Sequence, residues 1–364
     1  RGLATNSKKV KKDFIFFAIK GYKYNGEKFI KEAIYRGASL IICSKNCRYK
    51  NKSIAVLKTS DIRYLLSEIS SKYYKLKPKN IIAVTGTNGK TSVADLFYQI
   101  LKLSKIPVAS IGTLGIKLRE KIIKSNLTSP DTILLHKYLD NIKRKKIDNV
   151  IIEASSHGLE QKRLEHLSLK AGIFTNFSQD HLDYHKTMKS YFNAKMRLFK
   201  NVISPKKKII LDKSIKEYSI LKRISKSRSL SLIDINKTKD KLEKVIGNRF
   251  NDFQKKNLSM AVEAAKQCNL NEKQIFRSLK KIKDINGRLE LVKTFSNNIR
   301  VFVDFAHTPD ALSKSIISLK NTYNSDLSLV FGCGGDRDLK KRPLMAKVAN
   351  THCKNIYVTD DNPR

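Results

Sequence analysis

The stretch Val84–Ser92, which reads VTGTNGKTS, constrains the fold of this chain more than any other feature. The apolar run Ile81–Val84 leads into it as a buried strand would, and apolar residues at helical spacing follow it. Gly86 and Gly89 allow the backbone to curl, so that successive N–H groups and the N-terminus of the following helix point at an anion. The sequence therefore predicts a strand, a phosphate-binding loop and a helix.

Two side chains of this loop carry chemistry of their own. Lys90 and the Thr91 hydroxyl can reach a phosphate group and a Mg²⁺ ion. The loop departs from the common phosphate-loop spacing, because Val84 stands where that motif has its first glycine. The alternative is a glycine-containing turn whose lysine is solvated, but the flanking strand and helix patterns favour phosphate binding.

Predicted strands and helices alternate from residue 79 to residue 285, which implies a parallel sheet with helices on both faces. Ligands bind such sheets in a crevice outside the carboxyl ends of the strands. Before this region lies a small α/β unit that closes at Lys77-Pro78, and after it the doubly wound pattern begins again. We therefore expect an α/β chain with three domains, at residues 1–78, 79–285 and 286–364.

Polar clusters follow several of the predicted strands. Glu153 comes directly after the strand Val150–Ile152, and a carboxylate at a strand tip beside a phosphate loop usually holds Mg²⁺. A single histidine is more often structural, but Asp180–His185 contains two Asp and two His, which favours metal or phosphate chemistry. The hydroxyl-rich loop Asn126–Asp131 precedes a helix, so that helix capping and ligand binding both remain open for it.

Lys195 has an unusual position in its predicted helix. Tyr191, Lys195 and Leu198 share one face, so the lysine stands in an apolar stripe. One interpretation is that the side chain snorkels to solvent. If it stays buried instead, desolvation lowers its pKa and leaves a neutral amine, which can take up CO₂ and become an anionic carbamate.

Charge and cysteine content narrow the possible functions. The chain has 74 Lys+Arg against 32 Asp+Glu, a net charge of +42, which by itself suggests a nucleic-acid partner. Because the excess is nearly all lysine and is spread along the chain, we interpret it as solvated surface and expect no specific nucleic-acid binding. The five cysteines contain no C-x-x-C pair, which favours reduced thiols in a cytosol. No apolar stretch approaches the roughly 18 residues of a membrane span.

Six collinear stretches of the sequence resemble the Mur ligase family of peptidoglycan synthesis. They are VTGTNGKT (84–91), EASSHGLEQKR (153–163), TNFSQDHLDYH (175–185), YFNAK (191–195), DFAHTPDAL (304–312) and GCGGDRD (332–338). Within the family, the strings SSHGL, HTPDAL and DNPR are most similar to the enzymes that add the third residue of the stem peptide. The resemblance runs from Leu3 to Arg364, and it implies a chain that lacks a short N-terminal piece and the last quarter of a complete enzyme.

The resemblance implies a small N-terminal UDP-binding domain, a central ATP-binding domain related to phosphate-loop ATPases, and an incomplete Rossmann-like C-terminal domain that binds the amino acid. It also implies an ATP-dependent, Mg²⁺-dependent ligase that adds meso-diaminopimelate to UDP-MurNAc-L-Ala-D-Glu by way of an acyl phosphate. We expect a cytoplasmic monomer without a membrane partner. The alternatives are the lysine-adding form, folylpolyglutamate synthase, which the DHLDYH and DNPR strings disfavour, and a basic nucleic-acid-binding ATPase.

The resemblance implies catalytic and ATP-binding roles for individual residues. Arg288 would stabilise the transferring phosphoryl group. The catalytic set would be Lys90, Glu153, His181, carbamylated Lys195 and Arg288, and the Mg²⁺ ligands would be Thr91, Glu153, His181 and Lys195. The ATP-binding set would be Gly86, Thr87, Asn88, Gly89, Lys90, Thr91, Ser92, Asn257, Asp304 and His307.

The two other substrates have implied binding sets as well. Meso-diaminopimelate carries a distal carboxylate that lysine lacks; a guanidinium can grip it with two hydrogen bonds and would repel the ammonium of lysine. The implied diaminopimelate set is Arg337, Asp361, Asn362, Pro363 and Arg364. The implied set for the UDP-MurNAc-dipeptide is Ser7, Thr128, Ser129, Ser155, Gln161 and Arg163.

Overall fold

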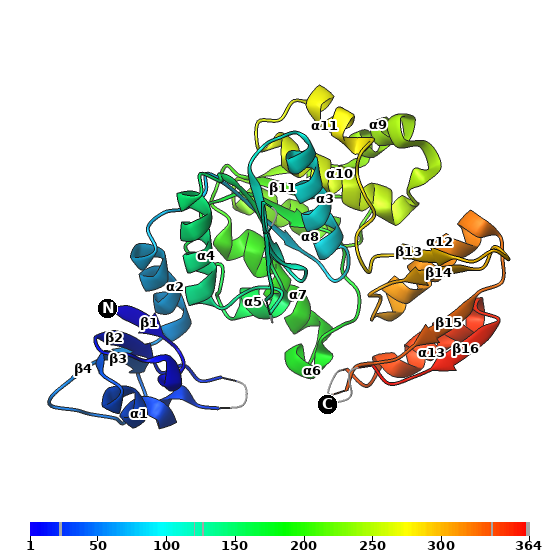
Figure 1. The fold of residues 1–364 in the computed structure, drawn as a ribbon. Helices are drawn as coiled ribbons and strands as arrows, with labels where there is room; N and C mark the ends of the chain where they lie inside the picture. Colours follow the sequence, from blue (N-terminus) through cyan, green and yellow to red (C-terminus); the bar gives the residue numbers. More distant parts are fainter. Residues whose placement is uncertain (22–23, 120, 126, 336–337, 362–364) are drawn as a thin grey trace.

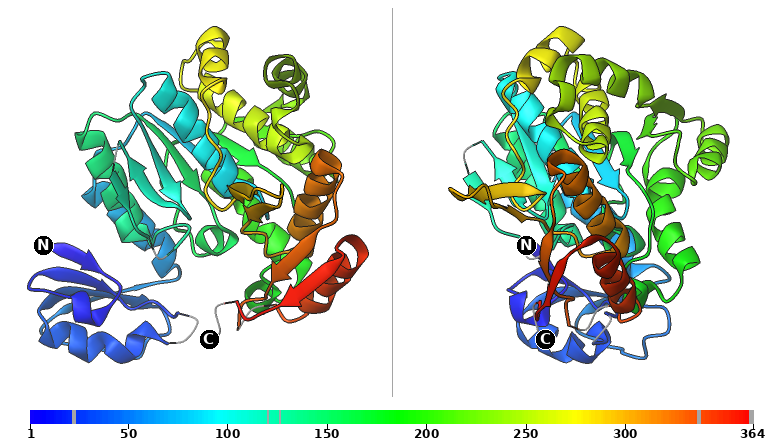
Figure 2. Two further views of the ribbon diagram at one scale, coloured as in Figure 1. Left: turned by 45° about the vertical axis from the view of Figure 1, so that its right-hand side comes forward. Right: turned by 90° about the vertical axis from the view of Figure 1, so that its right-hand side faces the viewer.

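The computed structural model describes residues 1–21, 24–119, 121–125, 127–335 and 338–361 of the chain. A large central part lies between a smaller N-terminal part and a smaller C-terminal part (Figure 1). The turned views in Figure 2 show both smaller parts beside the same end of the central part. All five cysteines are free, which agrees with the expected reduced thiols.

The N-terminal part is a parallel sheet with one helix against each face. Its strands are hydrogen-bonded in chain order and comprise β1 (Gly2–Ala4), β2 (Phe14–Phe17), β3 (Ala38–Ser44) and β4 (Ala55–Thr59). Successive side chains of a strand point to opposite faces. Phe16 therefore packs in the core with α1 (Ile30–Tyr35), and Phe17 packs with Leu66 of α2 (Ile62–Tyr73).

The central part is built on an eight-stranded sheet in the order β12-β11-β10-β5-β9-β6-β7-β8. The first six of these strands run parallel, as the alternating pattern predicted. They are β5 (Asn80–Thr85), β6 (Val108–Gly112), β9 (Asn149–Glu153), β10 (Leu169–Phe174), β11 (Lys208–Leu211) and β12 (Ser231–Asp234).

The edge of this sheet departs from the prediction. Two short strands, β7 (Gly115–Leu118) and β8 (Lys121–Ile123), continue the sheet in antiparallel orientation. They escape the sequence pattern because each is only three or four residues long and the residues of β8 are exposed. The parallel core is thus confirmed, with an antiparallel edge added to it.

Helices cover both faces of the central sheet. In β5, Ile82 and Val84 pack against α3 (Lys90–Leu103) and α10 (Asp252–Lys266), whereas Ile81 and Ala83 face the side of α4 (Thr132–Arg144). Since both faces are covered, the central strands carry apolar residues at nearly every position. The remaining helices are α5 (Ser156–Glu160), α6 (Leu182–His185), α7 (Met188–Arg197), α8 (Tyr218–Ser227), α9 (Asn236–Ile246) and α11 (Glu272–Leu279).

The C-terminal part contains two separate two-stranded sheets. β13 (Glu290–Thr294) and β14 (Arg300–Val303) pair antiparallel, and β15 (Ser328–Phe331) and β16 (Asn355–Val358) pair parallel. Two helices, α12 (Pro309–Tyr323) and α13 (Lys341–His352), pack on each other beside them. The predicted strands and helices are present, but within the described residues they do not join into one sheet.

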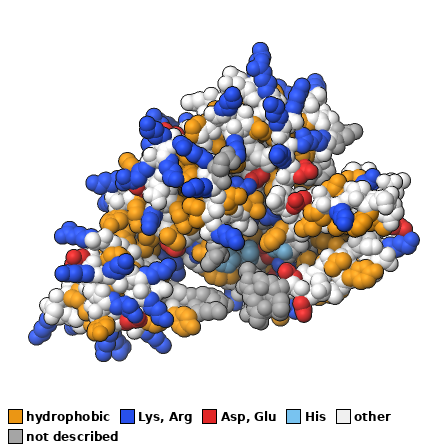
Figure 3. Space-filling model, in the orientation of Figure 1, with side chains coloured by type: hydrophobic (Ala, Val, Ile, Leu, Met, Phe, Trp, Pro, Cys, Tyr) orange, Lys and Arg blue, Asp and Glu red, His pale blue; other side chains and the backbone are white. Residues whose placement is uncertain are grey.

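The surface agrees with the interpretation of the net charge. Figure 3 shows Lys and Arg side chains scattered over the visible face, with apolar and uncharged side chains between them. Within the described part of the chain, none of the helices combines the length and apolar character that crossing a membrane requires.

Candidate functional site

A cleft of about 510 Å³ lies between the central and C-terminal parts, at the carboxyl ends of β5, β9 and β10. It is lined by most of the residues that the sequence singled out. They are Thr87, Asn88, Gly89, Lys90, Thr91, Ser92, Thr128, Ser155, His181, Lys195, Asn257, Arg288, Asp304, His307 and Asp361. This is the place at which an open α/β sheet is expected to bind a ligand.

The loop between β5 and α3 has the curled backbone that the glycines predicted. Gly86 and Gly89 have φ values of +146° and +85°. At Gly86 a Cβ atom would lie 1.9 Å from the Thr175 Oγ1 atom, so only glycine fits. The Lys90 Nζ atom donates to the carbonyl oxygens of Gly86 and Thr87, at 3.0 and 2.8 Å. The loop therefore presents its backbone and one ammonium group to the cleft.

Not every side chain of this loop faces a ligand. The Thr87 hydroxyl is buried and donates to the Ser178 carbonyl oxygen at 3.1 Å. Asn88 donates through its Nδ2 atom to Thr308 Oγ1 and Asp310 Oδ2, at 3.3 and 3.2 Å. The backbone N–H groups of Thr87 and Asn88 both donate to Asn176, at 2.9 Å each, so these two residues brace the loop.

Thr91 and Glu153 meet beneath the loop. The Thr91 Oγ1 atom donates to Glu153 Oε2 at 2.9 Å, and the backbone N–H of Thr113 donates to Glu153 Oε1 at 2.8 Å. Arg288 reaches in from the C-terminal part and donates to Thr91 Oγ1 at 3.1 Å. A hydroxyl, a carboxylate and a guanidinium thus converge, which suits a phosphate group with a Mg²⁺ counterion.

Lys195 is buried at 1% exposure, so the snorkelling alternative is wrong. Its Nζ atom donates to the Gly86 carbonyl oxygen at 2.6 Å and lies 4.4 Å from the centre of the Tyr191 ring. Burial, together with the neighbouring charge of Lys90, lowers the pKa of Lys195 well below its usual value. A neutral amine at the base of the cleft is the form that can react with CO₂.

His181 has a strained backbone and one unpaired ring nitrogen. Its φ of +55° lies in the left-handed region, which residues other than glycine adopt infrequently. Its Nε2 atom lies 3.3 Å from Asp180 Oδ2, while its Nδ1 atom is buried and has no hydrogen-bond partner among the described residues. Burial lowers the pKa of His181 to about 2. A neutral imidazole with an open nitrogen fits a metal ligand.

The metal set needs a modified lysine to be complete. In the described ranges, no three His, Cys, Asp or Glu side chains lie close enough together to hold a metal ion. The predicted set differs from such a cluster, because it counts the Thr91 hydroxyl and a carbamate on Lys195 beside Glu153 and His181. If Lys195 carries a carbamate, the residues present fit Mg²⁺, since hydroxyl and carboxylate oxygens are the ligands that Mg²⁺ prefers.

The predicted substrate residues of the central part form one network behind the cleft. Ser129 donates through its Oγ atom to the Glu153 carbonyl oxygen at 2.7 Å, and Ser155 caps α5 by accepting from the Gly158 N–H at 3.1 Å. Arg163 donates to the Ser129 carbonyl oxygen at 2.6 Å and to Gln161 Oε1 at 2.7 Å. Thr128 lines the cleft nearby.

Other predicted residues lie apart from this network. Ser7 is buried in the N-terminal part, where its Oγ atom donates to Glu32 Oε2 at 2.8 Å. Asp304 accepts a hydrogen bond from Ser315, and burial raises its pKa. Asp361 lines the cleft, whereas the remaining predicted diaminopimelate residues, Arg337, Asn362, Pro363 and Arg364, lie outside the described residues.

The structure adds a group of contacts that sequence reasoning missed. His185 lies with its Nε2 atom 3.0 Å from Ser156 Oγ and its Nδ1 atom 3.2 Å from Glu160 Oε2. The ring of His157 packs between those of His181 and His185, with centres 4.9 and 5.3 Å away. Both histidines of the Asp180–His185 run were noted in the sequence, but their partners come from another segment.

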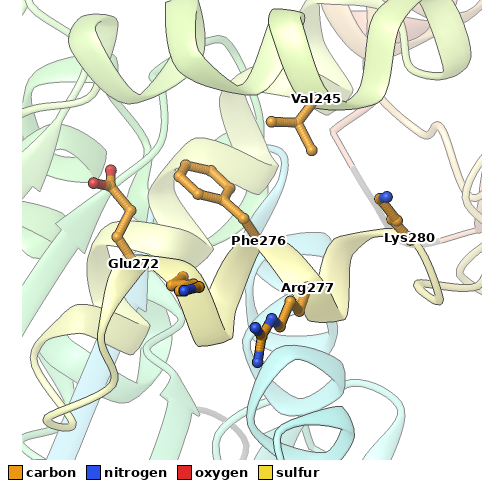
Figure 4. Close-up of a pocket in the computed structure, with 6 residues that line it drawn as sticks. Val245, Glu272, Phe276, Arg277 and Lys280 are labelled. Atoms are coloured by element: carbon orange, nitrogen blue, oxygen red, sulfur yellow. The ribbon is translucent and has the colours of Figure 1, made fainter.

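A second hollow lies elsewhere on the central part. It is formed between α9 and α11, where Val245 and Phe276 supply apolar surface and Glu272, Arg277 and Lys280 stand around them (Figure 4). None of the residues predicted from the sequence lines this hollow. It has no part in the site described above.

Comparisons with known proteins cover the whole chain. Three family models match: "Mur ligase family, catalytic domain" at residues 1–74, "Mur ligase middle domain" at 84–276 and "Mur ligase, glutamate ligase domain" at 287–364. UDP-N-acetylmuramoyl-L-alanyl-D-glutamate--2,6-diaminopimelate ligases from Rickettsia prowazekii and Brucella melitensis are 39% and 35% identical. Each match covers 100% of this chain and 80% or 79% of the relative.

Solved structures give the same fold. A structure of a ligase with the same name has a TM-score of 0.73 at 27% identity and covers 100% of this chain and 79% of its own. The MurF ligase from Thermotoga maritima in complex with ADP has a TM-score of 0.62 at 16% identity, covering 98% and 84%. A folylpolyglutamate synthase complex with AMPPCP and folate has a TM-score of 0.60 at 15% identity, covering 82% and 84%. The last two likenesses concern the fold alone.

Proposed function

The chain belongs to the Mur ligase family, and from this premise we propose that its cleft joins a carboxylate to an amine in an ATP-dependent reaction. The reaction is the addition of meso-diaminopimelate to UDP-MurNAc-L-Ala-D-Glu, which is the activity in the names of its relatives. We also propose that the chain works as a monomer in the cytoplasm.

The reaction balances in two steps. The terminal phosphoryl group of ATP passes to the free carboxylate of the D-Glu residue, which gives an acyl phosphate and ADP. The amine then attacks the acyl carbon, the bond from that carbon to the phosphate oxygen breaks, and inorganic phosphate leaves while the nitrogen loses a proton. Activation is needed because a free carboxylate is a poor electrophile.

The residues of the cleft have complementary tasks in this scheme. The loop from Gly86 to Ser92 and the N-terminus of α3 would hold the phosphates, with Lys90 as a positive charge. Arg288, which already contacts Thr91, would stabilise charge on the transferring phosphoryl group. The remaining proposed nucleotide contacts are Asn257, Asp304 and His307, which line the same cleft.

Thr91 and Glu153 would hold one Mg²⁺ ion, and His181 with carbamylated Lys195 would hold a second. Bound there, the ions would neutralise charge and bring two anionic substrates together. The carboxylate of the buried Glu153 is held in place by hydrogen bonds that it accepts from Thr91 and Thr113. The Nδ1 atom of His181 has no hydrogen-bond partner among the described residues and could bind the second ion.

The other substrates are assigned to the flanking parts of the chain. We propose that residues 1–78 bind UDP through Ser7 and that residues 79–285 bind ATP. The dipeptide end would lie near Thr128, Ser129, Ser155, Gln161 and Arg163. Residues 286–364 would bind diaminopimelate through Arg337, Asp361, Asn362, Pro363 and Arg364.

One observation carries the proposal: two groups from distant parts of the sequence, Glu153 and Lys195, meet at the phosphate loop. Glu153 Oε2 lies 2.9 Å from Thr91 Oγ1, and Lys195 Nζ lies 2.6 Å from the Gly86 carbonyl oxygen. A loop that only turned the chain would not need a buried carboxylate and a buried lysine against it. Burying either group without a partner costs several kcal/mol, on the order of the net stability of a domain.

A turnover assay tests the proposal. The protein is incubated with ATP, Mg²⁺, UDP-MurNAc-L-Ala-D-Glu and one amine at a time, and the product mass and phosphate release are measured. We expect a product with meso-diaminopimelate and none with lysine. Product with lysine alone would indicate the lysine-adding form. Phosphate release that DNA or RNA stimulates in the absence of the dipeptide would overturn the ligase assignment.

A further inference from the structure

Asp180 is a buried carboxylate that contacts both the central and the C-terminal part of the chain. It follows β10, immediately before His181, and is 3% exposed. Its Oδ1 atom accepts from the His181 backbone N–H at 2.9 Å and from Lys341 Nζ at 3.4 Å. Its Oδ2 atom lies 3.3 Å from His181 Nε2 and 3.4 Å from His307 Nε2.

Two of these partners come from the C-terminal part. Lys341 is the first residue of α13 and is itself only 4% exposed. A buried ammonium without a countercharge is strongly unfavourable, so Lys341 depends on Asp180. His307 accompanies it, with its Nδ1 atom 2.9 Å from the Phe305 carbonyl oxygen and its Nε2 atom 3.4 Å from Asp180 Oδ2. The C-terminal part thus docks on this carboxylate.

Neighbouring contacts strengthen the same junction. Gln179 donates to Asp338 Oδ2 at 3.2 Å, beside the Asp180 pair. Asn88 of the phosphate loop donates to Asp310 Oδ2, also at 3.2 Å. The Asp180–Lys341 ion pair is thus flanked by two further hydrogen bonds between the central and the C-terminal part.

Asp180 also determines which nitrogen of His181 is open. A carboxylate accepts but does not donate, so a neutral His181 carries its proton on Nε2, the atom near Asp180 Oδ2. The lone pair is then on Nδ1, which is the buried nitrogen without a hydrogen-bond partner among the described residues. A carboxylate behind a histidine commonly fixes the tautomer and the ring orientation for metal binding.

The geometry points to Asp180 as a positioning residue that couples docking of the C-terminal part to metal binding by His181. The inference rests on the proposed function in one respect, the assignment of His181 as a metal ligand. Docking brings Lys341 and His307 to the carboxylate of Asp180, which orients the His181 ring. The ring is therefore held in the orientation for metal binding when the C-terminal part is docked. Coupling between two sites is reciprocal, and a bound metal ion therefore favours docking.

The test uses the full chain, Mn²⁺ in bicarbonate buffer as the probe, and two readouts that require no turnover. Electron paramagnetic resonance measures Mn²⁺ affinity, and limited proteolysis measures protection of residues 286–361 with and without Mn²⁺. Lys341→Met and Asp180→Asn are expected to weaken Mn²⁺ binding about tenfold, the loss typical of an altered partner of a metal ligand, and to abolish the Mn²⁺-dependent protection. Lys354→Met, which removes a lysine from an exposed ion pair in the same part, is expected to change neither.

Lys341→Arg keeps the charge and is expected to retain both properties, which separates coupling from a general folding defect. Mn²⁺ affinity within twofold of the unaltered protein in Lys341→Met would overturn the coupling. Equal losses of Mn²⁺ affinity in Lys341→Met and Lys341→Arg would also overturn the coupling. If the unaltered protein binds no Mn²⁺ at all, both the proposed metal site and the coupling are wrong. If it binds Mn²⁺ and the variants bind Mn²⁺ equally well, only the coupling is wrong.

Discussion

Lys195 and Gly86 meet at the base of the cleft, where the lysine Nζ atom donates a 2.6 Å hydrogen bond to the glycine carbonyl oxygen. Lys90 donates to the same carbonyl oxygen at 3.0 Å. Burial lowers the pKa of both lysines, and the neighbouring charge of Lys90 lowers the pKa of Lys195 further. Lys195, the more buried of the two, is the one we expect to be neutral and to react with CO₂.

Lys195→Ala is therefore predicted to lower kcat on the order of 10²–10³-fold, the usual loss when one positioned charged group is removed from a reacting site. A short-chain carboxylic acid added to this variant should restore part of the activity, because it supplies the missing anion. Phosphate release in the ligase assay measures both effects. Lys200→Ala, which removes an exposed lysine nearby, should retain full activity. An inactive Lys195→Ala that no acid rescues would contradict the carbamate.

Gly112→Ala is predicted to weaken Mg²⁺ use without unfolding the protein. A Cβ atom at Gly112 would lie 2.0 Å from Glu153 Oε1, so the carboxylate would have to leave its place beside Thr91. We expect the Mg²⁺ concentration for half-maximal activity to rise about tenfold, together with a loss of stability of about 1–3 kcal/mol from overpacking. Glu153→Gln, which removes the charge but keeps the size, should show the same rise in Mg²⁺ demand. An unchanged Mg²⁺ dependence in Gly112→Ala would argue against Glu153 as a ligand.

The sequence was most informative where chemistry is local. The turn from β5 to α3 needs glycine at Gly86 and Gly89, and this requirement is visible in nine consecutive residues. For Lys195, helical periodicity predicted a place in an apolar stripe, but it left open whether the side chain stays buried or reaches solvent. The alternation of strands and helices, which is also a local pattern, predicted the parallel core of the central sheet.

Contacts between distant segments could not be predicted. Lys341 and Asp180 are separated by 161 residues, and no periodicity relates them. The short edge strands β7 and β8 follow the geometry of the neighbouring β6 more than a pattern of their own. In the C-terminal part, the antiparallel pairing of β13 with β14 depends on register, which the sequence does not state.

His136 is predicted to make the protein less stable in acid. It is fully buried on α4 beside Ser67 of α2, and burial lowers its pKa from the usual 6.5 to about 3. Between these values the unfolded chain binds a proton at this residue and the folded chain does not. The free energy of unfolding therefore falls as the pH falls from 6.5 towards 3, by about 1.4 kcal/mol per pH unit from this residue.

His136→Phe should remove this contribution, so that between pH 7.5 and pH 5 the variant loses about 2 kcal/mol less than the unaltered protein. Urea unfolding at the two pH values measures the difference. His166→Asn serves as the control, because His166 is exposed and has the positive φ that asparagine tolerates. An equal acid loss in His136→Phe and the unaltered protein would mean that His136 has the same pKa in the folded and the unfolded chain.

Arg163→Lys is predicted to raise the KM for UDP-MurNAc-L-Ala-D-Glu while the KM for ATP stays the same. The guanidinium bridges the Ser129 carbonyl oxygen and Gln161 Oε1 with two short hydrogen bonds, whereas the ammonium of lysine has no planar fork with which to hold both. Loss of one charge-assisted hydrogen bond corresponds to about 1.5–3 kcal/mol, or about 10- to 100-fold in KM.

Arg144→Lys is the matched control for this substitution, because Arg144 pairs with Asp140 on α4 and does not line the cleft. Lysine keeps the positive charge at this position, so neither KM should change. Steady-state rates at varied dipeptide and at varied ATP give the two KM values independently. If Arg163→Lys instead lowers kcat alone, Arg163 acts on the reacting groups and not on dipeptide binding, and the network of Ser129, Gln161 and Arg163 would then belong to the phosphoryl-transfer site.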